Sequence, residues 1–105
     1  MKNWKMVRQG DVLAIKIDQE IPSGAEKIES DKGTVLAYGE VTGHAHRLDD
    51  TKTELFEHNN QRFLNVKEAT NLVHEEHTKI PFAPGVYEIR RQIQYQPEEL
   101  KFVAD

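Results

Sequence analysis

The chain of 105 residues contains no cysteine. This absence excludes disulfide bonds, thiolate nucleophiles and every zinc site that depends on cysteine ligands. Any bound metal ion would therefore be held by histidine and carboxylate side chains. The sequence also lacks an excess of positive charge, because 14 basic residues stand against 18 acidic ones and give a net charge of −4. Nucleic-acid binding through bulk electrostatics is accordingly not expected.

Long apolar runs are also absent. No segment approaches the roughly 20 apolar residues that span a bilayer, and residues 1–5 (MKNWK) are not followed by the apolar stretch of a signal peptide. We therefore expect a cytoplasmic protein with no membrane partner, folded as a single domain over residues 1–105. The mean hydropathy of −0.72 indicates a modest core. A bound ion or self-association into an oligomer could then add to its stability.

Short alternating or β-branched segments, separated by turn residues, dominate the chain. The clearest are residues 12–17, residues 34–38 and the segment that follows Pro84-Gly85. The one helix signal starts at Gln96-Pro97, with acidic residues in its first turn. The sequence thus predicts an all-β fold, a small antiparallel barrel or sandwich of about seven strands with a short C-terminal helix. The other expected strands are residues 44–48, 54–56, 62–66 and 71–74.

All five histidines lie between positions 44 and 77, and four of them form two pairs. Residues i and i+2 of a strand share a face, so His44 and His46 would present two imidazoles to one ion. His74 and His77 are three positions apart, so both can bind only if the chain bulges or turns at Glu75-Glu76. The spacing therefore predicts that both pairs ligate one divalent metal ion.

The predicted centre would bind zinc by default, because imidazole nitrogens suit this ion, but Fe, Mn, Ni and Cu fit the same ligands. Glu75 and Glu40 are expected to serve as a further ligand, as a base or as groups that orient a histidine. Four histidines in a closed shell would make the ion structural. Three histidines with a bound water would permit catalysis, and the sequence does not decide between an enzyme and a binding protein.

Other interpretations of these residues stay open. Neutral histidines often serve as hydrogen-bond partners, which would make the chain a non-enzymatic oligomeric barrel or an adaptor. Clustered histidines beside acidic residues could also act as a pH sensor between about pH 5 and 7. Arg90-Arg91 could contact an anion or nucleic acid, although such a pair is more typical of a solvated strand face. His58, beside Asn59-Asn60, is expected to lie in a loop.

Five segments stand in a distinctive order along the chain. They are residues 8–12 (RQGDV), 39–46 (GEVTGHAH), 74–77 (HEEH), 84–88 (PGVYE) and 91–97 (RQIQYQP). This order resembles a family of small, uncharacterised bacterial and phage-associated β-rich proteins, and the resemblance implies a free-standing domain without implying an activity. The HxH segment is also similar in part to the metal motif of cupins. The chain departs from that motif in two places. Gly39 is one residue too close to His44, and Asp50 stands where the motif has a glutamate.

Overall fold

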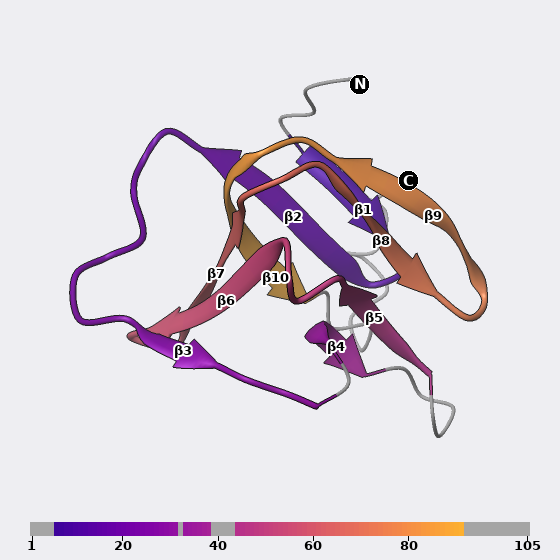
Figure 1. Ribbon diagram of the computed structural model, residues 1–105, viewed down its shortest axis with the longest axis horizontal. Coiled ribbons are helices and arrows are strands. Elements are labelled where there is room, and N and C mark those ends of the chain that lie inside the picture. The colour runs from indigo at the N-terminus through magenta and orange to yellow at the C-terminus, as the bar shows by residue number, and fades with distance from the viewer. Residues whose placement is uncertain (1–5, 32, 39–43, 92–105) are drawn as a thin grey trace, which may run out of the picture.

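The computed structural model describes residues 6–31, 33–38 and 44–91, which form ten β-strands and no helix (Figure 1). Every pairing between these strands is antiparallel, as predicted. The strands are β1 (Met6–Gln9), β2 (Val12–Ile17), β3 (Glu26–Ile28), β4 (Thr34–Tyr38), β5 (Ala45–Leu48), β6 (Thr53–His58), β7 (Gln61–Val66), β8 (Thr70–His74), β9 (His77–Phe82) and β10 (Gly85–Arg91).

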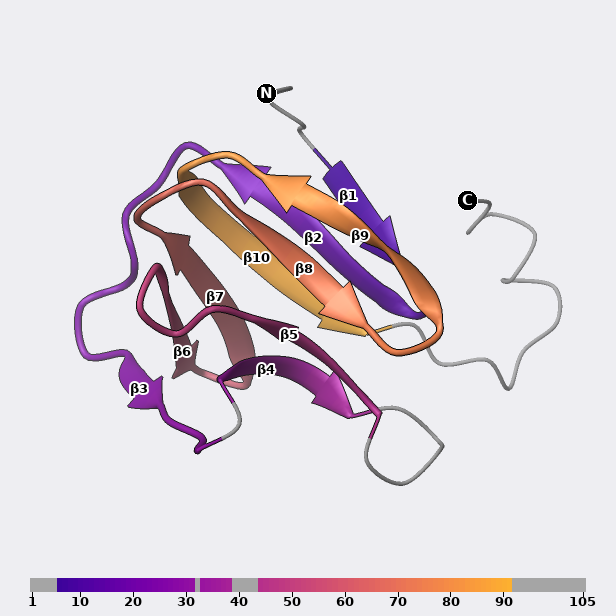
Figure 2. The ribbon, with the colours of Figure 1, turned by 45° about the vertical axis from the view of Figure 1, so that its right-hand side comes forward.

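The strands are arranged in two sheets that enclose the core (Figure 2). The larger sheet has the order β1-β2-β10-β7-β6-β3 and the smaller one β4-β5-β8-β9. Among the described residues no strand pairing joins the two sheets, so the fold is sandwich-like and the expected alternative of a closed barrel is wrong. Both sheets contribute apolar side chains to one buried cluster, which consists of Val7, Val12, Ala14, Leu36, Ala37, Leu48, Leu55, Leu64, Val66, Leu72, Phe82, Tyr87 and Ile89.

The sequence pattern predicted most strands but undercounted them. Residues 12–17 and 34–38 are strands with the expected bounds. The expected total of about seven is too low because β1, β3 and β9 were not anticipated. β9 contains Pro81, a residue that argues against a central strand, but β9 is an edge strand of the smaller sheet, where a missing N–H is tolerated. His58 is the last residue of β6 and does not lie in a loop.

Several expectations fall on parts of the chain that the structure does not describe. The expected C-terminal helix from Gln96 and the candidate residue Glu40 both lie outside the described residues. The single domain over residues 1–105 stays a prediction. Within residues 6–31, 33–38 and 44–91 there is no helix long and apolar enough to cross a membrane.

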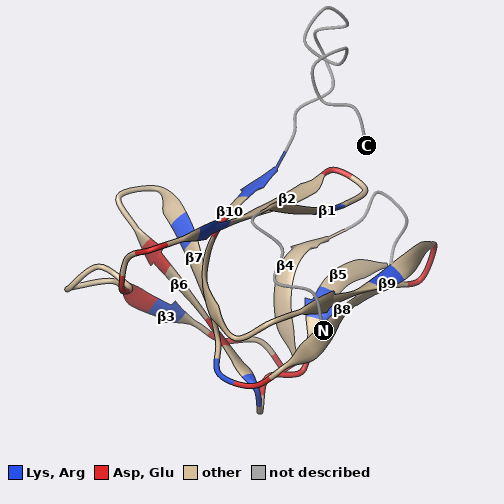
Figure 3. Cartoon of the chain, turned by 90° about the horizontal axis from the view of Figure 1, so that it is seen from above, with Lys and Arg blue, Asp and Glu red and all other residues tan. Residues whose placement is uncertain are grey.

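One corner of the sandwich brings the β1–β2 turn beside the β8–β9 hairpin, because β1 contacts β9 (Figures 1 and 2). Gln9, which is 3% exposed, joins the two sheets there. Its Nε2 donates hydrogen bonds to the carbonyl oxygens of Leu72, over 3.1 Å, and of Thr78, over 2.9 Å. Figure 3 shows the acidic tip of the β8–β9 hairpin, formed by the turn at Glu75 and Glu76. The paired histidines lie at this corner.

Candidate metal centre

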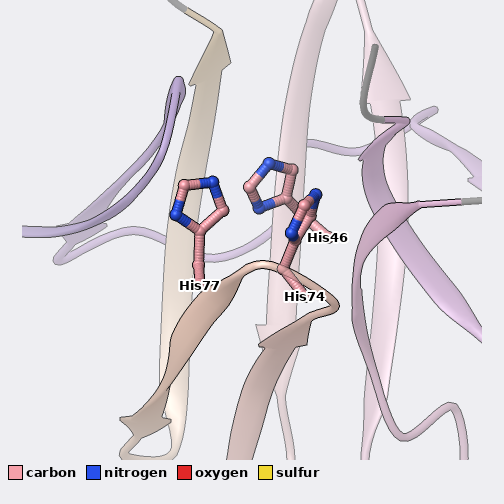
Figure 4. Close-up of side chains that lie close together, drawn as sticks. All are labelled: His46, His74 and His77. Carbon is pink, nitrogen blue, oxygen red and sulfur yellow. The ribbon is translucent and has the colours of Figure 1, made fainter. Parts of the chain in front are cut away.

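Three histidines from β5 and the β8–β9 hairpin converge (Figure 4). The ring centroids of His46 and His74 are 4.3 Å apart, those of His74 and His77 4.6 Å, and those of His46 and His77 5.6 Å. One ring nitrogen of each lies within 4.8 Å of a nitrogen of both others. This arrangement follows from strand pairing, because β5 pairs with β8 and the hairpin turns back on itself.

The β8–β9 hairpin contains the turn that His74 and His77 need if both rings are to reach one ion. The two residues face each other across the pairing of β8 with β9, and Glu75-Glu76 forms the turn between them. The register also shifts between Leu72 and His74, which re-aims the end of β8. Both rings therefore reach the same side, although a regular strand would have sent them to opposite faces.

The three rings differ in burial. His46 is 2% exposed, His74 is half-buried and His77 is exposed. The cluster is thus closed on the side of the core and open to solvent on the side of His77. An ion could reach the three nitrogens from solvent without any separation of the two sheets.

Gln9 fixes the proton on the ring of His46. Because its Nε2 donates to two backbone carbonyls, its Oε1 faces His46 Nδ1 as an acceptor, 2.8 Å away. His46 Nδ1 must then carry the proton, and the lone pair of the neutral ring lies on Nε2. Hydrogen bonds of this kind orient metal-binding histidines and fix their tautomer.

His46 and His74 are held in the neutral form that binds metals. Burial lowers the pKa of His46 to about 4, and the nearby ring of His74 lowers it further than the carboxylate of Asp11 raises it. Burial and the proximity of His77 lower the pKa of His74 as well. Neither ring must lose a proton to solution at neutral pH before it can ligate an ion.

His74 has a different hydrogen-bond arrangement from His46. The backbone N–H of Glu76 donates to His74 Nδ1 over 3.0 Å, so the proton of the neutral ring lies on Nε2. An ion bound at Nδ1 would replace this amide donor, and an ion bound at Nε2 would require the proton to move to Nδ1. His74 therefore changes its hydrogen bonding when an ion binds, whereas His46 is already in its ligand form.

The β1–β2 turn lies against the rings of His46 and His77. Gly10 adopts a φ of +59°, and a Cβ placed on it would lie 2.8 Å from His77 Nε2 and 3.2 Å from His46 Cε1. Glycine is therefore required both by the backbone conformation and by the space that the two rings occupy. The next residue, Asp11, places Oδ1 3.5 Å from His46 Nε2, and its Oδ2 accepts a hydrogen bond of 2.7 Å from Arg91 Nε.

The other predicted site residues occupy the margin of this cluster. His44 forms a second ligand-like group with His74 and Glu75, whose donor atoms also lie within 4.8 Å of one another. Its ring stands edge-on to His74 at 5.7 Å, and its Nδ1 is 3.2 Å from a carboxylate oxygen of Glu76. His44 and His46 therefore fall into different groups, which share His74.

Both carboxylate oxygens of Glu75 already have partners. Oε1 accepts a hydrogen bond of 3.0 Å from the backbone N–H of Ala45, and Oε2 is paired with the guanidinium of Arg47. Three groups lower the pKa of Glu75 to about 2. The backbone amide of Ala45 has the largest effect, and the backbone amide of Glu75 itself and the guanidinium of Arg47 add to it. In this structure Glu75 ties the hairpin turn to β5, which is a positioning role.

Sequence reasoning missed Gln9, Gly10 and Asp11, the three residues through which the β1–β2 turn contacts the histidines. A buried glutamine beside a left-handed glycine gives no metal signature of its own. Its relation to His46 arises only when the two sheets come together.

Comparison with known proteins identifies a family but no activity. A family model described as "Domain of unknown function (DUF8820)" matches residues 8–92. No curated protein matches the chain. No solved structure matches it either. The matched span includes the β1–β2 turn and all four paired histidines.

Proposed function

Because the chain belongs to the DUF8820 family, whose description states no function, we propose from the geometry alone that it binds one divalent metal ion through His46, His74 and His77. The observation that carries the proposal is the convergence of three imidazoles, with one nitrogen of each within 4.8 Å of the others. The lowered pKa values of His46 and His74 and the tautomer that Gln9 imposes on His46 support it.

The ligand set favours zinc and accepts Fe, Mn, Ni or Cu. Imidazole nitrogens suit all of these ions, and three of them leave at least one coordination position for another group. A water molecule in that position would become more acidic, so a metal-dependent reaction is compatible with the site. We propose binding and assign no reaction, because the described residues do not define a substrate.

The group of His44, His74 and Glu75 is the competing site. It is the weaker candidate because both oxygens of Glu75 are engaged, one by the Ala45 amide and one by the Arg47 guanidinium, and an ion would compete with these partners. Since both groups need His74, substitution of that residue cannot separate them. Substitution of His46 or of His44 can.

Elemental analysis of the untagged protein, purified without chelator, tests the proposal. We expect one ion per chain in the native protein and in His44→Ala, and no stoichiometric ion in His46→Ala or His77→Ala. His58→Ala is the matched control, because it removes a histidine that belongs to neither group. Native protein without metal, and without a thermal shift on addition of Zn, Fe, Mn, Ni or Cu, would contradict the proposal.

Further aspects of function also stay proposals. We propose a cytoplasmic location. We also propose that the likeness to cupins extends no further than a β-fold lined with histidines. The alternative of an oligomeric module or adaptor predicts self-association or partner binding that does not change when His46 is replaced. Sedimentation of the native protein and of His46→Ala, each with and without metal, distinguishes that alternative from a metal-binding protein.

A further inference from the structure

Asp11 stands beside the lone pair of His46. Its Oδ1 is 3.5 Å from His46 Nε2, and its side chain is 26% exposed on the β1–β2 turn. Arg91 donates to the other oxygen, Oδ2, over 2.7 Å. The Arg91 contact leaves Oδ1 directed towards the histidine cluster.

The contact between Asp11 and His46 joins two acceptors. Gln9 places the proton of His46 on Nδ1, so Nε2 presents a lone pair to the carboxylate. The carboxylate of Asp11 is paired through its other oxygen with the guanidinium of Arg91. Two electron-rich atoms thus face each other at neutral pH, and a cation between them would turn repulsion into attraction.

The separation of the two atoms matches that of neighbouring ligands around a small ion. Bonds of about 2.0 to 2.1 Å at a tetrahedral angle place adjacent ligand atoms about 3.4 Å apart. The observed distance between Oδ1 and Nε2 is 3.5 Å. Asp11 is not among the residues whose donor atoms all lie within 4.8 Å of one another. It therefore approaches from the His46 side and must move closer to the other two rings.

We infer that Asp11 Oδ1 is the fourth protein ligand, which completes a centre of three histidines and one carboxylate. The inference builds on the proposed function, since it presupposes an ion held by His46, His74 and His77. Arg91 acts as a positioning residue, because its hydrogen bond to Oδ2 leaves one oxygen for the ion. An oxygen ligand brings the centre closer to the preferences of Mn and Fe than three imidazoles alone would.

Titration with Co(II), followed by visible absorption and by competition with a chromophoric chelator, tests this ligand. The visible spectrum of Co(II) depends on the number and type of its ligands, so it responds to the loss of a ligand and not to a merely structural change. We expect Asp11→Asn to change the spectrum and to weaken binding by more than about 100-fold, beyond the roughly 10- to 100-fold cost of changes outside the ligand shell.

Two matched variants separate ligation from charge and from turn geometry. Glu76→Gln removes one negative charge beside the cluster, and Arg91→Gln removes the ion pair of Asp11 while keeping its carboxylate. Both should retain the native Co(II) spectrum, because neither variant loses a ligand. Glu76→Gln should bind with affinity within about 10-fold of native, whereas Arg91→Gln, which loses the contact that orients Asp11, should bind roughly 10- to 100-fold more weakly. Circular dichroism and thermal unfolding of each apo variant check that the fold is intact.

The outcomes distinguish this inference from the proposed function. If the native protein binds Co(II) and His46→Ala does not, while Asp11→Asn keeps the native spectrum, the metal site stands and Asp11 is not a ligand. If Arg91→Gln and Asp11→Asn change the spectrum equally, the turn and not the carboxylate is responsible, and the inference also fails. If the native protein binds no Co(II), the proposed function itself is wrong.

Discussion

Gln9 and His46, 37 positions apart in the sequence, are joined by a hydrogen bond of 2.8 Å between Oε1 and Nδ1. The glutamine belongs to an edge strand of the larger sheet and the histidine to the smaller sheet. Their contact ties the geometry of the candidate metal centre to the packing of the two sheets. A buried side chain with its amide donors on two carbonyls cannot rotate freely, so His46 keeps one tautomer.

Replacement of Gln9 should therefore weaken metal binding without removing a ligand. We expect Gln9→Leu to lower affinity by roughly 10- to 100-fold, the usual effect of losing the partner that orients a metal-binding histidine. It should also reduce the free energy of unfolding by about 1 to 3 kcal/mol, because buried carbonyls lose their donors. Chelator competition and denaturant unfolding measure the two effects.

Gln61→Leu is the control for this substitution, because Gln61 is an exposed glutamine whose amide donates a hydrogen bond to Glu88. It should leave metal affinity unchanged. Equal losses of affinity in the two variants would mean that the contact between Gln9 and His46 has no role in the site.

Gly10 offers a second test, in which space and backbone conformation can be separated. Gly10→Ala places a Cβ 2.8 Å from His77 Nε2 at a φ of +59°. We expect it to displace His77, to lower metal affinity and to destabilise the fold by more than the roughly 1 kcal/mol cost of a left-handed alanine. Isothermal titration and thermal unfolding provide the measurement.

The matched variant is Gly24→Ala, because Gly24 also has a positive φ, +88°, and a Cβ there would meet nothing within 4 Å. Gly24→Ala should lose only the stability that an alanine with a positive φ costs, and it should retain full metal affinity. If Gly10→Ala binds the ion as tightly as Gly24→Ala, His77 is not constrained by the turn.

The sequence was most informative where the structure depends on residues that are close together along the chain. β2 and β4 were predicted with their bounds because β-branched alternation and flanking turns are local signals. β9 was missed because its first residues are exposed and polar and Pro81 interrupts the pattern. Its place at a sheet edge, which makes that sequence acceptable, depends on strands elsewhere in the chain.

The same limit applies to the candidate centre. Spacing alone predicted that His44, His46, His74 and His77 ligate one ion and that a turn was needed between the last two. The structure contains that turn. That His44 and His46 fall into different groups could not be predicted, since this depends on the register between β5 and the hairpin. The contacts of Gln9 and Asp11 depend on the approach of one sheet to the other, which leaves no trace in residue spacing.

Glu75 was first interpreted as a base or metal ligand, and its contacts lead to a different expectation. Glu75→Gln keeps an acceptor for the Ala45 amide and removes the charge that pairs with Arg47. We expect metal content to stay at the native level and the melting temperature to fall only slightly, because the pair is partly exposed to solvent. Loss of the ion in this variant, measured by elemental analysis beside His44→Ala, would instead favour the group of His44, His74 and Glu75.

Acid should destabilise the apo protein through His46. Its pKa is lowered from 6.5 to about 4 in the fold, so the unfolded chain binds the proton more readily. The neutral ring's contribution to stability is fully present above about pH 6.5 and is lost as the pH falls towards 4. A shift of this size corresponds to about 3 kcal/mol, at 1.36 kcal/mol for each unit.

Urea unfolding of the chelator-treated protein between pH 4 and 7.5 measures this dependence. The free energy of unfolding should rise with pH across the window, and His46→Gln should flatten most of the rise whatever its absolute stability. His74, whose pKa is also lowered, accounts for part of what remains, and the lowered pKa values of Asp11 and Glu75 add to the rise only near the acid end of the window. An equally steep rise in His46→Gln would show that His46 takes up its proton at the same pH in the folded and in the unfolded chain. The folded ring would then be charged below about pH 6.5, as in the unfolded chain, and a charged ring has no lone pair on Nε2 for a metal ion.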